Sequence, residues 1–157
     1  GLTHALKAGR LKRNFQGYTD DPADVLIGVG ASSISRFPQG FAQNAPATSA
    51  HTAAIRDGRF STSRGHLFKG QDVLRGRLIE ALMCDFRIDA AEILRDHPIT
   101  ESQLQALFAQ AGKEFPDLLK ISAEGLYIPP PARALTRMIA RCFDAYDLSK
   151  AGHSSAI

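Results

Sequence analysis

The stretch Asp24-Val-Leu-Ile-Gly-Val-Gly30 decides how the first part of this chain is expected to fold. Its four apolar residues include β-branched side chains and are bounded by glycines, a composition that favours a strand buried on both faces. Strands of this kind are usual in parallel α/β sheets. One such strand cannot form a sheet, and the chain supplies at most one further candidate. The stretch therefore predicts an α/β remnant whose partner strands are missing.

The residues that follow this stretch predict a loop and then a helix. Residues 31–44 are rich in Ser, Gly, Pro, Gln and Asn, a composition typical of loops. Residues 45–56 predict a helix with Asn44 as its cap and Pro46 in its first turn.

From about residue 70 the apolar residues take helical spacing. The first helix carries Leu74, Leu78, Ile79, Leu82 and Met83 on one face. Residues 89–96 predict a second short helix, and Thr100, followed by Ser102, predicts the start of a third.

The end of the chain predicts a hairpin and one more helix. Residues 119–128 favour a β-hairpin with glycine in its turn, and Pro129-Pro-Pro131 then opens the last helix. That helix is expected to carry Leu135, Met138, Ile139, Cys142, Phe143 and Tyr146 on one face. Three helices, a hairpin and another helix is the order of a mainly α, winged-helix-like domain, expected over residues 67–148. Residues 149–157 lack periodicity and are predicted to be a disordered tail.

Composition and charge narrow the class of protein. The 157 residues are 44% hydrophobic and 22% charged with a net charge of +3, which is ordinary for a soluble globular protein. The cations are spread along the chain, and residues 101–112, the helix that would read DNA, contain no Arg or Lys. Nucleic acid is therefore not an expected partner. No apolar run approaches the roughly 20 residues that span a bilayer, so no membrane partner is expected.

Motifs that carry chemistry are weak or absent. The two cysteines, Cys84 and Cys142, lie in apolar stretches and favour buried free thiols in a reducing cytoplasm. Two thiols cannot make a four-ligand metal site, and the five histidines are scattered, so no metal ligand is expected. The segment Gly28-Val-Gly30-Ala-Ser-Ser33 has serine where a dinucleotide loop has its third glycine, which favours a tight turn. These signals alone do not name a function.

A set of stretches in a fixed order does resemble a known family. The stretches are Arg13-Asn-Phe-Gln-Gly-Tyr-Thr19, Asp24-Val-Leu-Ile-Gly-Val-Gly-Ala-Ser-Ser-Ile-Ser35, Phe41-Ala-Gln-Asn44, Leu82-Met-Cys-Asp-Phe86 and Arg141-Cys-Phe-Asp-Ala-Tyr146. Their order and spacing resemble the C-terminal third of the oxygen-independent coproporphyrinogen III oxidases, also called coproporphyrinogen dehydrogenases. The resemblance runs from about residue 5 to residue 147, and its most specific part is the first stretch.

The resemblance implies a fold and an activity for the complete protein. Members of the family fold as a radical-SAM βα barrel followed by a mostly helical domain. The resemblance therefore implies that residues 1–66 are the edge of the barrel, its last strands and loops, together with a connector. They oxidatively decarboxylate two propionates of coproporphyrinogen III to give protoporphyrinogen IX in haem biosynthesis, using radicals from S-adenosylmethionine. Their 4Fe–4S cluster is held by a C-x-x-x-C-x-x-C loop, which this chain lacks. The isolated chain is therefore expected to be inactive, with no catalytic residue, and its expected partners are the missing N-terminal barrel and coproporphyrinogen III.

The resemblance also implies site residues. Those matching Phe15, Gln16 and Ile34 lie beside the S-adenosylmethionine or substrate pocket in the family. The alternative is that Phe15 and Ile34 are core residues and that Gln16 satisfies backbone groups. Arg13 and Lys12 are candidates for substrate carboxylates, or else cations on a solvated strand edge.

Three roles for the chain as a whole remain open. Residues 67–148 are expected to cover the mouth of the barrel as a lid. Otherwise the chain is a stand-alone winged-helix-like module that binds porphyrin or nucleic acid, or a truncation without independent function.

Overall fold

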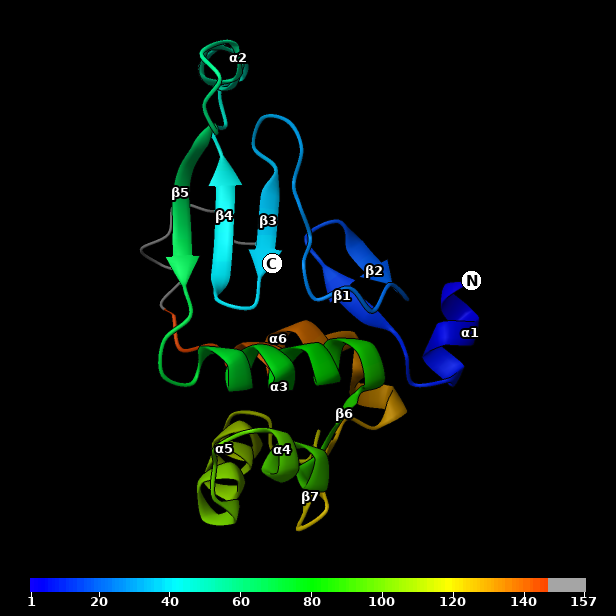
Figure 1. Cartoon of the computed structure of the whole chain (residues 1–157). Coiled ribbons are helices and arrows are strands. Elements are labelled where there is room, and N and C mark those ends of the chain that lie inside the picture. The colour runs from blue at the N-terminus through cyan, green and yellow to red at the C-terminus, as the bar shows by residue number, and fades with distance from the viewer. Residues whose placement is uncertain (147–157) are drawn as a thin grey trace. The chain divides into compact units, whose positions relative to one another are not determined.

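The computed structural model describes residues 1–146 (Figure 1). The expected disordered tail, residues 149–157, lies outside the described residues. Contacts divide the chain into two compact units. The first, here called the helical unit, contains Gly1–Arg13, Tyr18–Asp20 and the chain from Gln71 onward; the second, the sheet unit, contains Asn14–Gly17 and Asp21–Gly70.

The helical unit combines helices with a small antiparallel sheet. Its elements are α1 (Leu2–Lys7), α3 (Asp72–Asp85), β6 (Arg87–Asp89), α4 (Ala90–Asp96), α5 (Glu101–Glu114), β7 (Lys120–Ser122), β8 (Gly125–Tyr127), a 3-10 helix (Pro130–Leu135) and α6 (Thr136–Arg141). The sheet has the order β6-β8-β7, so β8 is central. This part of the chain is therefore mixed α/β, since β6 adds a third strand to the expected hairpin.

Helical spacing predicted the core of this unit. Leu74, Leu78 and Leu82 of α3 are buried and share one core with residues of α4, α5, β8, α6 and the turn after α6, among them Ile93, Leu104, Phe108, Leu126, Ile139 and Phe143. At the start of α5 the Thr100 side chain and that of Gln103 form a reciprocal capping box. The predictions of α3, α4, α5 and the hairpin are confirmed.

The prediction of one long last helix is wrong. The chain after Pro129 first forms the 3-10 helix and only then α6. The α-helix ends at Arg141, so the residues from Cys142 to Tyr146 do not continue its face. Ile139 and Phe143 are fully buried, whereas Met138 and Tyr146 are about half exposed.

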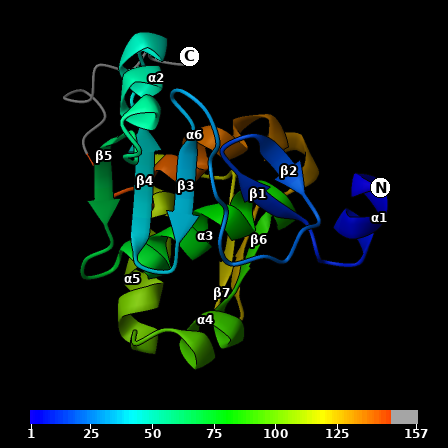
Figure 2. The same ribbon diagram turned by 45° about the horizontal axis from the view of Figure 1, so that its top comes forward.

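The sheet unit is built on three antiparallel strands, β3 (Ile34–Phe37), β4 (Gly40–Asn44) and β5 (Thr62–Leu67), in the order β3-β4-β5. Figure 2 shows these strands side by side, with α2 (Thr48–Arg56) between the end of β4 and the start of β5. The predicted loop at residues 31–44 is therefore wrong. Although its polar composition is typical of a loop, this stretch contains the β3-β4 hairpin, whose strands are joined by a tight turn at Pro38 and Gln39.

The start of α2 also differs from the prediction. The helix begins at Thr48 after Ala47, so Pro46 precedes it and Asn44 does not cap it. Asn44 instead ends β4, where its side chain bonds to the 24–30 stretch.

The prediction that residues 24–30 form a strand buried on both faces is wrong for the described residues. The stretch makes one isolated antiparallel bridge, between Leu26 and Arg36 of β3. Its outer side chains are exposed: Val25 by 46%, Ile27 by 61% and Val29 by 87%. Burial of such a strand requires neighbours on its outer edge and face, and residues 1–146 provide none there.

Candidate ligand pocket in the sheet unit

A short hairpin supplies the first wall of the site. Strands β1 (Lys12–Asn14) and β2 (Gly17–Thr19) are joined by Phe15 and Gln16. The side-chain oxygen of Asn14 accepts hydrogen bonds from the backbone N–H of Gln16 at 2.8 Å and of Gly17 at 3.2 Å. This local turn fixes the backbone of the tip, because the Asn side chain takes the place of a backbone acceptor.

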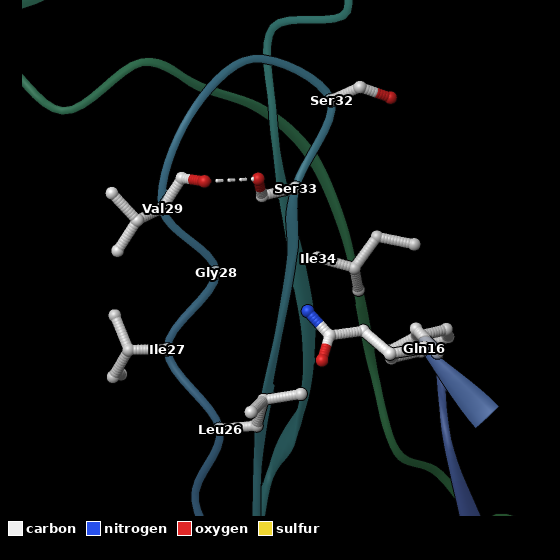
Figure 3. Close-up of a pocket in the computed structure, with 9 residues that line it drawn as sticks. Gln16, Leu26, Ile27, Gly28, Val29, Ser32, Ser33 and Ile34 are labelled. Atoms are coloured by element: carbon white, nitrogen blue, oxygen red, sulfur yellow. Dashed lines mark hydrogen bonds between the residues drawn. The ribbon is translucent and has the colours of Figure 1, made fainter. Parts of the chain in front are cut away.

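The segment from Leu26 to Ser33 supplies the opposite wall, and polar side chains hold its shape. Asn44 donates its side-chain amide to the carbonyl of Gly28 at 3.3 Å and to that of Gly30 at 3.0 Å. The Ser33 hydroxyl donates to the Val29 carbonyl at 2.6 Å (Figure 3). These bonds satisfy carbonyls of an otherwise irregular segment.

Gly28 allows this segment to approach β3 closely. The backbone N–H of Gly28 donates to the hydroxyl of Ser35 at 3.0 Å. A Cβ at Gly28 would lie 2.8 Å from the backbone C and O of Ile34, too close for any side chain. The glycine is therefore a steric requirement of the packing.

Together these elements enclose a pocket of about 410 Å³, lined by Phe15, Gln16, Leu26, Ile27, Gly28, Val29, Ser32, Ser33 and Ile34. In Figure 3 the side chains of Gln16 and Ile34 lie on the same side of the 26–29 segment, and the Ile27 and Val29 side chains point away from them. The three residues implied by the resemblance thus line one pocket: Phe15 and Gln16 from the tip of the β1-β2 hairpin, and Ile34 from β3. The volume is in the range of small-molecule and cofactor sites.

The two predicted carboxylate-binding cations lie in the helical unit and face an acid. The Lys12 ammonium is 3.9 Å from the Glu80 carboxylate, and the backbone N–H of Arg13 donates to Glu80 at 3.3 Å. Arg77 also pairs with Glu80 at 3.6 Å. Glu80 therefore holds the start of the hairpin against α3.

The donor set of this chain does not fit an iron–sulfur cluster. No group of three or more Cys, His, Asp or Glu that could hold a metal occurs among residues 1–146. Burial raises the pKa of the Cys84 thiol from its usual value near 9 to about 11. Burial and the hydrogen bond to Glu114 raise the pKa of Cys142 to about 12, although this thiol is only partly buried. Both thiols therefore hold their protons more tightly than an ordinary cysteine, which disfavours the thiolate form that binds metals.

The lining of the pocket combines polar and apolar groups. The Gln16 amide offers a donor and an acceptor at its edge, and Leu26 and Ile34 offer apolar surface. Sequence reasoning did not find Leu26, Ser32 and Ser33 as lining residues, although the tight turn predicted at Gly28-Val-Gly30 was a signal for them.

Among residues 1–146, no helix combines the length and apolar character that crossing a bilayer requires.

Comparison with known proteins finds relatives that share one name. The chain is 60% identical over its whole length to an oxygen-independent coproporphyrinogen III oxidase from Paracoccus denitrificans, of which it covers 35%. It is 55% identical over 94% of its length to one from Cereibacter sphaeroides, of which it covers 33%. No protein-family model matches the chain.

A solved structure agrees with these relatives. The coproporphyrinogen III oxidase from Escherichia coli, described as a radical SAM enzyme, matches 93% of this chain with a TM-score of 0.82 and 29% identity. The match covers 34% of that structure. The fold is thus that of a segment of a radical SAM enzyme. The chain is similar over nearly its whole length to a segment of the oxygen-independent coproporphyrinogen III oxidases and spans about a third of the length of the relatives it matches.

Proposed function

We propose that the complete protein oxidatively decarboxylates coproporphyrinogen III to protoporphyrinogen IX without oxygen, and that this chain is its C-terminal third. In this proposal the chain forms one wall of the pocket that binds S-adenosylmethionine or substrate. The observation that carries the proposal is the gathering of Phe15, Gln16 and Ile34 in one pocket. It occurs in a chain 60% identical to an oxidase of that name.

Each pocket residue suits a separate task. Gln16 can both donate to and accept from an adenosine or a pyrrole edge. Ile34 offers an apolar surface for a flat ring, and Phe15, half exposed, can exclude water from the reacting centre. The S-adenosylmethionine and the 4Fe–4S cluster supply the radical chemistry when bound, and the cluster ligands lie outside this chain.

The remaining parts have supporting roles in the proposal. Arg13 and Lys12 are candidate contacts for substrate carboxylates, with Lys12 shared with Glu80. The winged-helix-like module expected over residues 67–148 is part of the proposal, and the order α3, α4, α5, β7, β8 and α6 from Gln71 onward supports it. We place this module over the mouth of the barrel as a lid. A full-length protein cut after residue 66 that kept its full activity would contradict the lid.

Anaerobic turnover tests the proposed function directly. The purified, cluster-loaded full-length protein is expected to convert coproporphyrinogen III to protoporphyrinogen IX only when S-adenosylmethionine is present. Ile34→Asp, which places a charge in the pocket, is expected to abolish turnover while the cluster absorbance stays unchanged. The matched control is Ile121→Asp, at a partly exposed position of β7 outside the pocket, which is expected to keep turnover. Absence of turnover by the wild-type protein under these conditions would refute the proposal.

A further inference from the structure

The register of the β3-β4-β5 sheet places Arg64 on the same face of the sheet as the pocket residue Ile34. Ile34 pairs with Gln43, and Gln43 pairs with Arg64. Directly opposed residues of antiparallel strands lie on the same face of the sheet, so Arg64 shares the face on which Ile34 lines the pocket. Neighbouring strands are about 5 Å apart, so the Cα of Arg64 lies roughly 10 Å from that of Ile34. A small ligand that contacts Ile34 can therefore meet the long side chain of Arg64.

A chain of hydrogen bonds connects the pocket rim to this cation. The Gln43 amide nitrogen donates to the Ser32 carbonyl at 2.9 Å and lies 3.3 Å from the Ser32 hydroxyl. The Gln43 amide oxygen accepts from Arg64 Nε at 2.6 Å. Ser32 lines the pocket and has a left-handed backbone, with φ of 64°. Because the carbonyl of Ser32 can only accept, it fixes the orientation of the Gln43 amide and turns the oxygen toward Arg64.

This arrangement prepares Arg64 for an anion. The bond to Gln43 uses Nε alone, so the two terminal amino groups can donate in parallel to a carboxylate. Arg36 lies on the same face, two residues from Ile34 along β3, and bridges to the pocket residue Leu26. Two cations therefore share the face of the sheet that lines the pocket, which favours a ligand with more than one negative charge.

We propose that Arg64, oriented by Gln43, binds a carboxylate of the ligand that occupies the pocket, with Arg36 as the second cation of the site. The inference rests on the proposed function, in which both ligands carry carboxylates. One is the amino-acid end of S-adenosylmethionine, and the others are the propionates of coproporphyrinogen III. The shared chemistry is a carboxylate held by a planar guanidinium.

The test compares Arg64→Ala and Arg64→Lys with the wild type in the full-length protein. Affinity for S-adenosylmethionine is measured by calorimetry, and affinity for coproporphyrin III, an oxidised tetrapyrrole with the same propionates, by fluorescence. Arg64→Ala is expected to weaken one ligand by tenfold or more and to leave the other within twofold. Weaker S-adenosylmethionine binding assigns Arg64 to the amino-acid carboxylate, and weaker coproporphyrin binding assigns it to a propionate. Arg64→Lys is expected to restore part of the loss, because it keeps the charge but not the paired donors.

The matched control is Arg59→Ala. Arg59 lies in the same unit but pairs with Asp57 at 2.9 Å on the exposed turn after α2. The inference would be overturned if Arg64→Ala bound both ligands as tightly as Arg59→Ala does. It would also be overturned if Arg64→Ala and Arg59→Ala lost the same affinity for each ligand. These readouts do not require turnover. A wild-type protein that binds both ligands but does not react therefore argues against the proposed function while Arg64 is still tested.

Discussion

The ring of Phe15 meets the ring of Phe41 edge to face, with centroids 5.0 Å apart and planes inclined by 79°. Phe41 in turn meets Phe68 at 5.0 Å and 89°. Phe15 stands at the hairpin tip and Phe41 on β4, so this contact attaches the tip to the sheet that carries the rest of the pocket. The wall formed by Phe15 and Gln16 therefore depends on a residue outside the pocket lining.

Replacing Phe41 with leucine is expected to loosen this wall. The change keeps an apolar side chain but removes the ring contact, worth about 0.5–1.5 kcal/mol, which corresponds to roughly two- to tenfold in affinity. The affinity of the full-length protein for S-adenosylmethionine is the measurement. Phe68→Leu, which removes the Phe68 ring contacts with Phe41 and His66 but leaves the Phe15–Phe41 contact, is the control and is expected to have a smaller effect. Equal affinities in the two variants would show that Phe41 has no special role.

Gly28→Ala is expected to disrupt the pocket. Its Cβ would lie 2.8 Å from the backbone of Ile34, so the 26–30 segment must move away from β3. Ligand affinity is expected to fall at least tenfold, and the melting temperature to decrease. The control is Gly76→Ala in α3, where a Cβ meets nothing within 4 Å. There the helix should gain about 0.5–1 kcal/mol from the better helix former. A Gly28→Ala protein as stable and as tight-binding as the control would contradict the packing described here.

Removing Glu80 is expected to release the start of the hairpin from α3. The Glu80 side chain is only 15% exposed and accepts from the Arg13 N–H. Its loss in Glu80→Ala should cost about 1–2 kcal/mol locally, so exchange of the Arg13 amide should become roughly tenfold faster. Glu80→Gln keeps an acceptor for the Arg13 N–H, so its exchange rate should lie between those of the wild type and of Glu80→Ala. The readout is hydrogen exchange resolved to residues 11–19, with the exposed Glu101→Ala as control; equal exchange in Glu80→Ala and the control would exclude this anchor.

The thiols are expected to resist alkylation in the folded protein. Burial raises the pKa of Cys84 to about 11, so the reactive thiolate is scarce at about pH 8. Because the folded pKa is raised above the unfolded value near 9, Cys84 stabilises the fold fully below about pH 9, and this contribution is lost as pH rises toward 11. Iodoacetamide labelling followed by peptide mass analysis should show much slower modification in buffer than in urea. Equal rates in both conditions would contradict the burial of Cys84.

The helical unit could be predicted largely from the sequence, because its signals are local. The apolar residues of α3 recur at helical spacing, and Thr100 caps α5 three residues before Gln103. Signals of this kind need no knowledge of distant neighbours. The last helix was the exception, since the geometry after Pro129 depends on how a 3-10 turn packs.

The sheet unit could not be predicted in the same way. Strand β5 is almost entirely exposed and has the composition of a loop, so its pairing with β4 left no periodic signal. The stretch 24–30 has the composition of a buried strand, but among residues 1–146 it makes only one isolated bridge and its outer side chains are exposed. Phe15, Gln16 and Ile34 were indicated by resemblance alone. The bond from Arg64 to Gln43 joins residues 21 positions apart and required the observed register.

The most direct test of the central claim is the KM for S-adenosylmethionine of full-length Gln16→Ala, measured in anaerobic turnover of coproporphyrinogen III. Gln110→Ala, at an exposed position of α5, is the matched control. If this chain forms the pocket wall, the Gln16 variant should have a KM at least fivefold higher than the wild type for S-adenosylmethionine or for coproporphyrinogen III. Its cluster absorbance should be unchanged. KM and kcat values equal to those of the Gln110 variant for both ligands would contradict the account.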